Sequence, residues 1–235
     1  LGGVPVNIDG DAGGLKDAVY SDPQGTASVY FIYGNSDLST INPVGVTTTT
    51  GNAYFGLSVY TFPSINGDTA DDWGAIGLNF DAAAKREIEI FYGGSAYSDG
   101  AALTPDLILA ADDGGFPRAV VNVGSVNDDA HDDLLVTTST DSYIVFGPFS
   151  DLNTIPYCLK TTACTDTANY TPLPDGRIVT LSQIIDSDDE GGDTVSATAL
   201  GDLNNDGFAD FAIGVEDYNN QGLAAVVYGR SSWSA

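Results

Sequence analysis

Side-chain oxygens are concentrated at a regular spacing in one short stretch near the end of the sequence. The stretch DLNNDGFAD, residues 202–210, holds three Asp and two Asn in nine positions, with glycine at position 6. Oxygens on alternate residues 1, 3 and 5, followed by a backbone carbonyl at 7 and a later carboxylate, can wrap a single calcium ion. The sequence therefore predicts a calcium site here. Its expected ligands are Asp202, Asn204, Asp206, the carbonyl of Phe208, and Asp210.

Three further loops repeat this spacing with poorer ligands. Numbered in chain order, loop 1 is 9–17, loop 2 is 64–72, loop 3 is 125–133 and loop 4 is 202–210. Loops 2 and 3 begin with a neutral serine and loop 1 has glycine at position 5, so we expect up to four Ca²⁺ ions, bound most strongly at loop 4. The expected ligands are Ser64, Asn66, Asp68, the carbonyl of Ala70, and Asp72; Ser125, Asn127, Asp129, the carbonyl of His131, and Asp133; and Asp9, Asp11, the carbonyl of Leu15, and Asp17.

Other interpretations of these loops fit less well. Asp, Asn and Gly are common in ordinary turns, but turn chemistry alone predicts scattered positions and not oxygens at 1, 3, 5 and 9. An EF-hand would need a Glu at position 12 and flanking helices. His131, the only histidine, lies at position 7 of loop 3, which favours a solvated loop residue over a catalytic base. We find no catalytic constellation and expect no enzyme activity.

The segments that flank the loops read as short β-strands. Each loop is followed by a β-rich run, a polar turn and a second β-rich run that ends in glycine, as in ASVYFIYG, EIEIFYG, SYIVFG and AAVVYG. A further strand can be read before the next loop in VGVTTTT, PDLILAA and RIVTLSQII. The repeats therefore cover roughly 1–53, 54–114, 115–191 and 192–235. Four-stranded antiparallel units that recur with each loop predict an all-β chain. They favour a β-propeller over a β-sandwich.

The sequence resembles the FG-GAP repeat family, whose members include the propellers of integrin α-subunits and bacterial secreted proteins. GDLNNDGFADFAIG, the strands AAVVYGR and SYIVFG, and the Phe55-Gly56 pair in YFGLSV carry the resemblance. It implies calcium loops between the first and second strands of each blade, with partners on the opposite face. Seven blades are common in the family, so we expect either a segment of a longer propeller or four blades with irregular closure.

Charge and cysteine content narrow the class of partner. The formal net charge is −26, with 33 acidic against 7 basic residues, which excludes nucleic-acid binding because phosphates could not be neutralised. The sequence contains no 18-residue apolar run of the kind that would indicate membrane insertion. Cys158 and Cys164 stand in a Thr-rich loop and suit a disulfide in an oxidising compartment, with two free thiols as the alternative.

These features together predict a calcium-binding extracellular or cell-surface β-propeller. Its expected role is non-enzymatic: adhesion, surface assembly, or binding of an extracellular protein or glycan. Other chains, or further blades of the same assembly, are also expected partners. The alternative is a lectin-like or accessory module of a secreted enzyme whose active site lies elsewhere.

Overall fold

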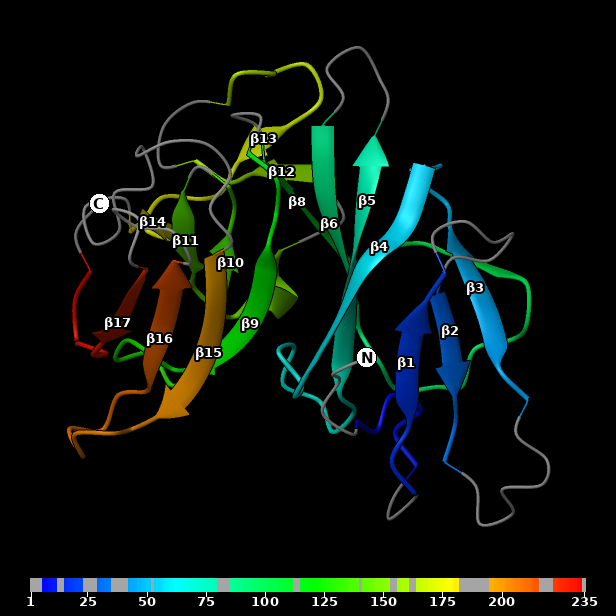
Figure 1. The fold of residues 1–235 in the computed structure, drawn as a ribbon, viewed down its shortest axis with the longest axis horizontal. Helices are drawn as coiled ribbons and strands as arrows, with labels where there is room; N and C mark the ends of the chain where they lie inside the picture. Colours follow the sequence, from blue (N-terminus) through cyan, green and yellow to red (C-terminus); the bar gives the residue numbers. More distant parts are fainter. Residues whose placement is uncertain are drawn as a thin grey trace. The chain divides into compact units, whose positions relative to one another are not determined.

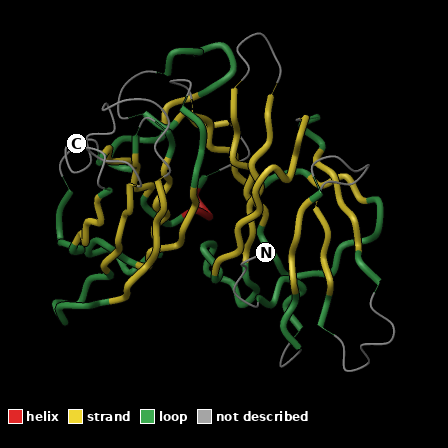
Figure 2. Tube along the Cα trace, viewed as in Figure 1, coloured by secondary structure: helices red, strands yellow, loops and turns green. Residues whose placement is uncertain are grey.

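The fold is all-β, as the sequence predicts. A computed structural model describes residues 6–11, 15–22, 29–34, 42–51, 53–79, 85–111, 115–139, 141–152, 156–160, 164–181, 195–215 and 222–233. Within these ranges the only helical element is a 3₁₀ turn, Phe149–Asp151, and all other regular structure is strand (Figures 1 and 2). No described helix has the length and hydrophobicity needed to span a bilayer.

The chain divides into two compact units. Unit 1 comprises Leu1–Leu109 and Leu152–Ile155, and unit 2 comprises Ala110–Asp151 and Pro156–Ala235. Unit 1 contains loops 1 and 2, and unit 2 contains loops 3 and 4. The expected repeat boundary at 114/115 lies close to the end of the first segment of unit 1, whereas the boundary at 191/192 lies outside the described residues.

Two sheets form unit 1. The first has the order β1-β2-β3-β7 and is antiparallel except that β7 runs parallel to β3. In the second, β4, β5 and β6 are antiparallel neighbours, and β8 lies beside β6. The bounds are β1 Ala18–Ser21, β2 Val29–Ile32, β3 Val44–Thr48, β4 Ala53–Phe62, β5 Asp72–Asn79, β6 Lys85–Phe91, β7 Ala101–Leu103 and β8 Leu107–Ala111.

Aromatic side chains fill the core of unit 1. The Trp73 ring stacks on Phe91 with centroids 4.3 Å apart and meets Phe31 edge to face at 5.0 Å. The Trp73 indole N–H donates to the Tyr97 hydroxyl at 3.0 Å, so this buried polar group is satisfied. Such packing needs side chains from several strands at once, which ties the strands that follow loops 1 and 2 into one core.

The Phe55-Gly56 pair lies at an irregularity in β4. The pairing of β4 with β5 shifts register between Ala53 and Ser58, and Gly56 has φ of +84°, which favours glycine. Phe55 is 2% exposed and its ring contacts Phe91 and Trp73. The pair therefore bends the strand while anchoring it in the core.

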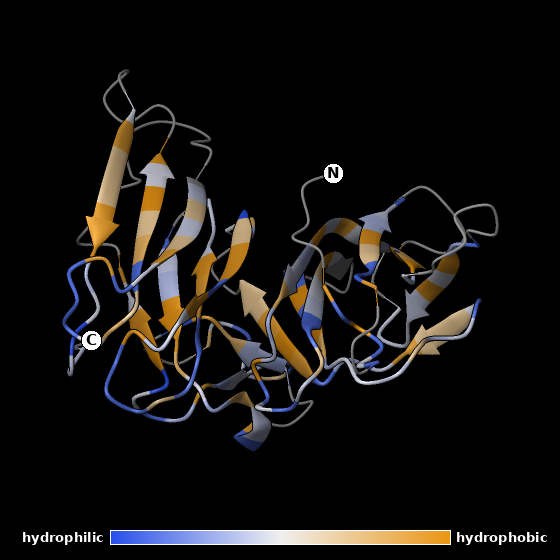
Figure 3. Cartoon of the chain, turned by 90° about the horizontal axis from the view of Figure 1, so that it is seen from below, coloured by the Kyte–Doolittle hydropathy of each residue, from blue (hydrophilic) through white to orange (hydrophobic). Residues whose placement is uncertain are grey.

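Unit 2 also contains two antiparallel sheets. Their orders are β14-β11-β10-β9 and β15-β16-β17, and a short parallel pair, β12-β13, belongs to neither of them. The bounds are β9 Ala119–Gly124, β10 Asp133–Thr137, β11 Ser142–Val145, β12 Pro156–Cys158, β13 Thr171–Pro172, β14 Ile178–Thr180, β15 Val195–Gly201, β16 Asp210–Val215 and β17 Leu223–Val227. The sheets of the chain thus differ in strand number. Hydrophobic segments lie mainly in the strands and hydrophilic ones in the loops (Figure 3).

The cysteine loop is closed by a disulfide, which confirms one of the two alternatives left open by the sequence. Cys158 and Cys164 are bonded, with Cα atoms 5.8 Å apart. Both are buried and pack with Ala110 and Tyr170 in a small separate cluster. The disulfide therefore cross-links the end of β12 to Cys164 within unit 2.

Candidate metal-binding loops

The last Asp of every loop joins two distant backbone groups. In loop 4, Asp210 accepts the Leu203 N–H and the Gly229 N–H, one on each carboxylate oxygen, both at 2.8 Å. The same two bonds recur in every loop, from the apolar residue near its start and from the glycine two residues after the second strand that follows it. They are Ile8 and Gly34 to Asp17; Ile65 and Gly93 to Asp72; and Val126 and Gly147 to Asp133. We call this the Asp–Gly latch.

Close approach explains the glycine in the latch. A Cβ placed on Gly229 would lie 2.5 Å from the Ala209 carbonyl oxygen, and one on Gly93 would lie 2.2 Å from that of Asp71. A Cβ placed on Gly147 or on Gly34 would lie similarly close to the backbone of its own loop. Glycine recurs at this place because the loop backbone occupies the space that a side chain would need. The sequence shows the recurring glycine but not this cause.

Positions 3, 5 and 7 share a second hydrogen-bond pattern. In loop 4 the Asn204 Oδ1 accepts the Asp206 N–H, the Asp206 Oδ1 accepts the Phe208 N–H, and Asn204 Nδ2 donates to Asp206 Oδ2, all at 2.9–3.0 Å. Loops 2 and 3 repeat all three bonds through Asn66, Asp68 and Ala70, and through Asn127, Asp129 and His131. The pattern holds the two side chains of positions 3 and 5 together above the loop backbone.

Position 1 distinguishes loop 4 from loops 2 and 3. The Asp202 carboxylate accepts the Asp206 N–H at 3.0 Å and the Gly207 N–H at 2.9 Å, so it turns into the loop. The Ser64 hydroxyl donates to Asn66 Oδ1 at 2.8 Å, and the Ser125 hydroxyl donates to the Asn127 carbonyl at 3.1 Å. Among loops 2, 3 and 4, only loop 4 thus brings two carboxylates, at positions 1 and 5, to one side of the loop.

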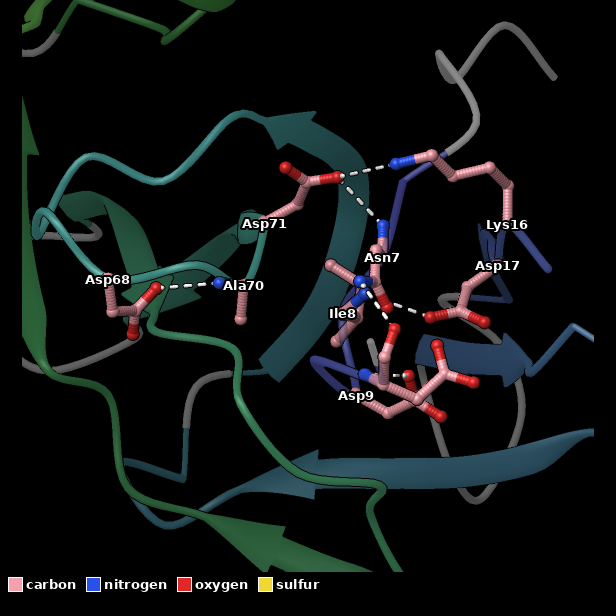
Figure 4. A network of polar contacts seen from close by, with 9 residues as sticks. Asn7, Ile8, Asp9, Lys16, Asp17, Asp68, Ala70 and Asp71 are labelled. Carbon is pink, nitrogen blue, oxygen red and sulfur yellow. Dashed lines mark hydrogen bonds and ion pairs between the residues drawn. The ribbon is translucent and has the colours of Figure 1, made fainter. Parts of the chain in front are cut away.

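Loop 1 starts two residues earlier than the sequence predicts. Its latch donor is Ile8, nine residues before Asp17, whereas the other loops have a separation of seven. The Asp11 N–H donates to Asp9 Oδ1, which is the bond from position 5 to position 3 in the other loops. Asn7, Asp9 and Asp11 therefore correspond to positions 1, 3 and 5, and Asp9 does not occupy position 1. Figure 4 shows Asn7 and Asp9 in this loop.

Asn7 is a candidate ligand that the ungapped comparison missed. The available signal was the polar–apolar–polar triplet that opens each loop, NID in loop 1 beside SIN, SVN and DLN. The Asn7 Oδ1 is buried and has no hydrogen-bond donor among the described residues. Its backbone N–H donates to Asp71 Oδ2 at 2.7 Å, and Lys16 Nζ lies 3.5 Å from the same oxygen. A buried oxygen without a donor fits a cation at this end of the loop.

The remaining predicted positions lie in the described loops with different exposure. Gly13, expected at position 5 of loop 1, lies outside the described residues. Among the residues at position 7, Ala70 is 2% exposed, whereas Leu15 is 53% exposed. The latch residues are inaccessible: Asp72, Asp133 and Asp210 are fully buried. Burial raises the pKa of Asp72 and of Asp133 to about 7, although the backbone hydrogen bonds of the latch act in the opposite direction.

The donor set fits calcium and not a softer metal. All the candidate ligands are oxygens of Asp, Asn, Ser or the backbone, which are the donors that Ca²⁺ takes. Within the described ranges, no three His, Cys, Asp or Glu side chains lie close enough to hold a metal by themselves. Any ion here would therefore need amide, hydroxyl and backbone oxygens beside the carboxylates. A latch carboxylate keeps further lone pairs after accepting two N–H groups, so it could serve a cation as well.

Comparison with known protein families identifies one of the repeats. Residues 194–227, which contain loop 4 and the strands β15 to β17, match the family model described as the FG-GAP repeat. This confirms the resemblance drawn from GDLNNDGFADFAIG. A search of curated proteins finds no match to the chain.

Proposed function

We propose that this chain is a calcium-binding module of the β-propeller type, built from FG-GAP-like repeats, which acts outside the cell in binding or assembly and has no enzyme activity of its own. The observation that carries the proposal is the hydrogen-bond pattern common to loops 2, 3 and 4, which gathers oxygen side chains at the same positions in each. Ordinary turns have no reason to repeat both the latch and this pattern.

The repeat of strands supports a propeller. After each loop the chain forms the same succession, a strand that starts near the latch Asp, a second strand that ends two residues before the latch Gly, and, in the first three repeats, a further strand beside it. Units of this kind pack face to face around an axis in propellers. The repeats would then correspond to blades, with the loops on one face.

Calcium would be held differently in each loop. In loop 4 the proposed ligands are the carboxylates of Asp202 and Asp206, the amide oxygen of Asn204, the carbonyl of Phe208, and Asp210. In loop 1 we propose Asn7 in place of a first carboxylate, with Asp9 and Asp11 behind it. Bound calcium would supply positive charge to loops whose only lysine or arginine is Lys16, and this would relieve repulsion in a chain of net charge −26. Affinity should follow the number of carboxylates.

The disulfide and the charge support a location outside the cell. Disulfides persist in secreted and cell-surface proteins and are rare in reducing compartments. A strongly acidic surface keeps a protein soluble where calcium is abundant. We further propose an extracellular protein or glycan as the partner, because the described strands and loops present surface to such a partner. His131 is exposed in loop 3, and its backbone N–H is bound to Asp129.

Calcium titration of the isolated chain tests the metal part of the proposal. We expect calorimetry to show several sites, the tightest of them lost or weakened in Asp206→Asn. Asp175→Asn is the matched control, because Asp175 is exposed in a turn outside the loops. No heat of binding in the wild type, or equal loss in the two variants, would overturn it. Binding to arrayed glycans and surface proteins, measured in calcium and in EDTA, tests the binding role, and hydrolase activity of the chain would exclude it.

A further inference from the structure

Loop 2 contains the only Asn-Gly pair in the sequence. Asn66 stands at position 3 and Gly67 at position 4. In loops 3 and 4 the residue after the position-3 Asn is Asp128 or Asn205, and loop 1 has Asp9 in place of the Asn. The backbone nitrogen that follows an Asn can attack the side-chain amide, and glycine leaves this attack open because it has no Cβ. Loop 2 therefore carries the Asn whose amide is easiest to reach.

The surroundings of Gly67 leave its nitrogen accessible. Gly67 is exposed, and a Cβ placed on it would meet nothing within 4 Å. Its N–H makes no hydrogen bond to any of the described residues. Gly67 has φ of +86°, but loop 4 has Asn205 with φ of +60° at the same position. The left-handed backbone is thus common to both loops, and the missing side chain sets loop 2 apart.

The Asn66 amide oxygen accepts two hydrogen bonds. The Ser64 hydroxyl donates to Asn66 Oδ1 at 2.8 Å, and the Asp68 N–H donates to the same oxygen at 3.0 Å. Attack on Cγ places negative charge on Oδ1, so two donors already point to where that charge develops.

The equivalent amides of loops 3 and 4 each have one such donor among the described residues. Asn127 Oδ1 accepts only the Asp129 N–H, because the Ser125 hydroxyl turns to the Asn127 backbone carbonyl. Asn204 Oδ1 accepts only the Asp206 N–H. Both the open nitrogen and the second donor are therefore features of loop 2.

Loop 1 shows that an aspartate fits at position 3 before a glycine. Asp9 precedes Gly10, which has φ of +70°. Asp9 Oδ1 accepts the Asp11 N–H, just as Asn66 Oδ1 accepts the N–H of position 5 in loop 2. Loop 1 thus has at this point the residues that loop 2 would have if Asn66 lost its amide.

We propose that Asn66 is a site of spontaneous deamidation, which gives loop 2 carboxylates at positions 3 and 5 and strengthens its binding of a divalent cation. The Gly67 nitrogen gives its proton to a base in the solvent and bonds to Asn66 Cγ, while the bond from Cγ to Nδ2 breaks and ammonia leaves. Water then opens the cyclic imide to aspartate or to isoaspartate. One water is consumed, one ammonia is released, and the chain gains one negative charge.

The gain in cation binding rests on the proposed function, whereas the deamidation does not. At present Asn66 Nδ2 donates to Asp68 Oδ2 at 2.9 Å. In the aspartate product two carboxylates replace this donor and acceptor, so the empty loop loses a hydrogen bond and gains a repulsion. A divalent cation between the two carboxylates removes the repulsion, and calcium affinity rises with the number of charged ligands.

Peptide mass spectrometry of the whole chain, incubated in EDTA at mildly alkaline pH, tests the deamidation. We expect Asn66 to be converted about tenfold faster than Asn127 or Asn204, or more. Gly67→Asn is the matched control, because it gives loop 2 the Asn-Asn-Asp order of loop 4 and Asn205 already has a left-handed backbone there. It should slow the conversion to the rate of Asn204. Equal rates at the three Asn residues, or no slowing in Gly67→Asn, would overturn the proposal.

Calorimetry on Asn66→Asp tests the effect on the loop. The variant should bind calcium about tenfold more tightly at one site than the wild type does, and circular dichroism verifies that its fold is retained. An affinity equal to that of the wild type would refute the gain in binding, even if Asn66 deamidates. No heat of calcium binding in either protein would instead refute the proposed function, and with it the cation at loop 2, while the conversion measured in EDTA would stand.

Discussion

Replacing Asp210 in EDTA tests what the Asp–Gly latch contributes to stability without any bound metal. In Asp210→Ala the Gly229 N–H, which is buried, and the Leu203 N–H, which is partly buried, both lose their acceptor. An unpaired buried N–H costs about 1–3 kcal/mol, so the two together should cost about 2–5 kcal/mol. Domains are stable by about 5–15 kcal/mol, so the loss is a large fraction of the stability of unit 2. This loss should occur without any calcium present.

Asp206→Ala is the matched comparison in the same loop. Asp206 is exposed, and its carboxylate accepts only the exposed Phe208 N–H and an amide N–H of Asn204. Water can replace these partners, so in EDTA the substitution should change the free energy of unfolding by about 0.5 kcal/mol or less. In calcium the cost of Asp206→Ala should rise, because the proposed ion loses a carboxylate. The stability of Asp206→Asn in calcium should lie between that of the wild type and that of Asp206→Ala.

Denaturant unfolding measures these differences. A Trp73→Phe background leaves Trp233 as the only tryptophan, and Trp233 lies in unit 2, where its indole N–H donates to the Val126 carbonyl. The free energy of unfolding is then obtained from urea curves of Trp233 fluorescence in EDTA and in calcium. If Asp210→Ala lost no more stability in EDTA than Asp206→Ala, the latch would not hold the repeat together, and the role assigned to Asp210 would be wrong.

Three further outcomes are expected. Gly229→Ala should destabilise unit 2 by about 1–3 kcal/mol in urea unfolding, because its Cβ meets backbone, whereas Gly214→Ala meets only the rotatable Ser196 hydroxyl and should cost less. In EDTA the free energy of unfolding should fall between about pH 4 and about pH 7, because burial raises the pKa of Asp72 and Asp133 to about 7 and the folded state keeps protons that the unfolded chain releases near pH 4. Asp133→Asn should flatten that slope, and a slope unchanged by it would contradict the reasoning. Calcium at about 100 times the dissociation constant should add about 2.7 kcal/mol per site and raise the melting temperature, and identical melting curves in calcium and EDTA would count against metal in the loops.

Local sequence was sufficient for the strands and for most of the loops. The strand that follows each loop begins at or beside its last Asp, because that residue ends the turn and the apolar run after it must enter a sheet. The disulfide could be predicted because six residues of separation bring two cysteines within bonding reach. Loop 1 was misaligned because two extra residues between positions 5 and 9 leave its Asp spacing plausible in the wrong register.

Long-range relations could not be predicted from local pattern. The parallel pairing of β7 with β3 joins Ala101 to Val46, and no local signal in either segment specifies that partner. The reason for the glycine after each second strand lies in a distance to a loop far back along the chain. The buried Asn7 Oδ1 without a hydrogen-bond donor is likewise a property of the packed loop, because the sequence does not show whether an Asn side chain is buried.

The latch also has a consequence for how such a chain can change. The latch requires one carboxylate and one glycine. Its second hydrogen bond comes from a backbone N–H near the start of the loop, which almost any residue supplies. The proposed metal ligands at positions 1, 3 and 5 can therefore be exchanged between loops while the latch stays as it is. Ser125→Asp in loop 3 would supply the carboxylate that opens loop 4 while Val126 stays in the core. Under the proposed function, repeats of this kind can diverge in calcium affinity long before they lose their fold.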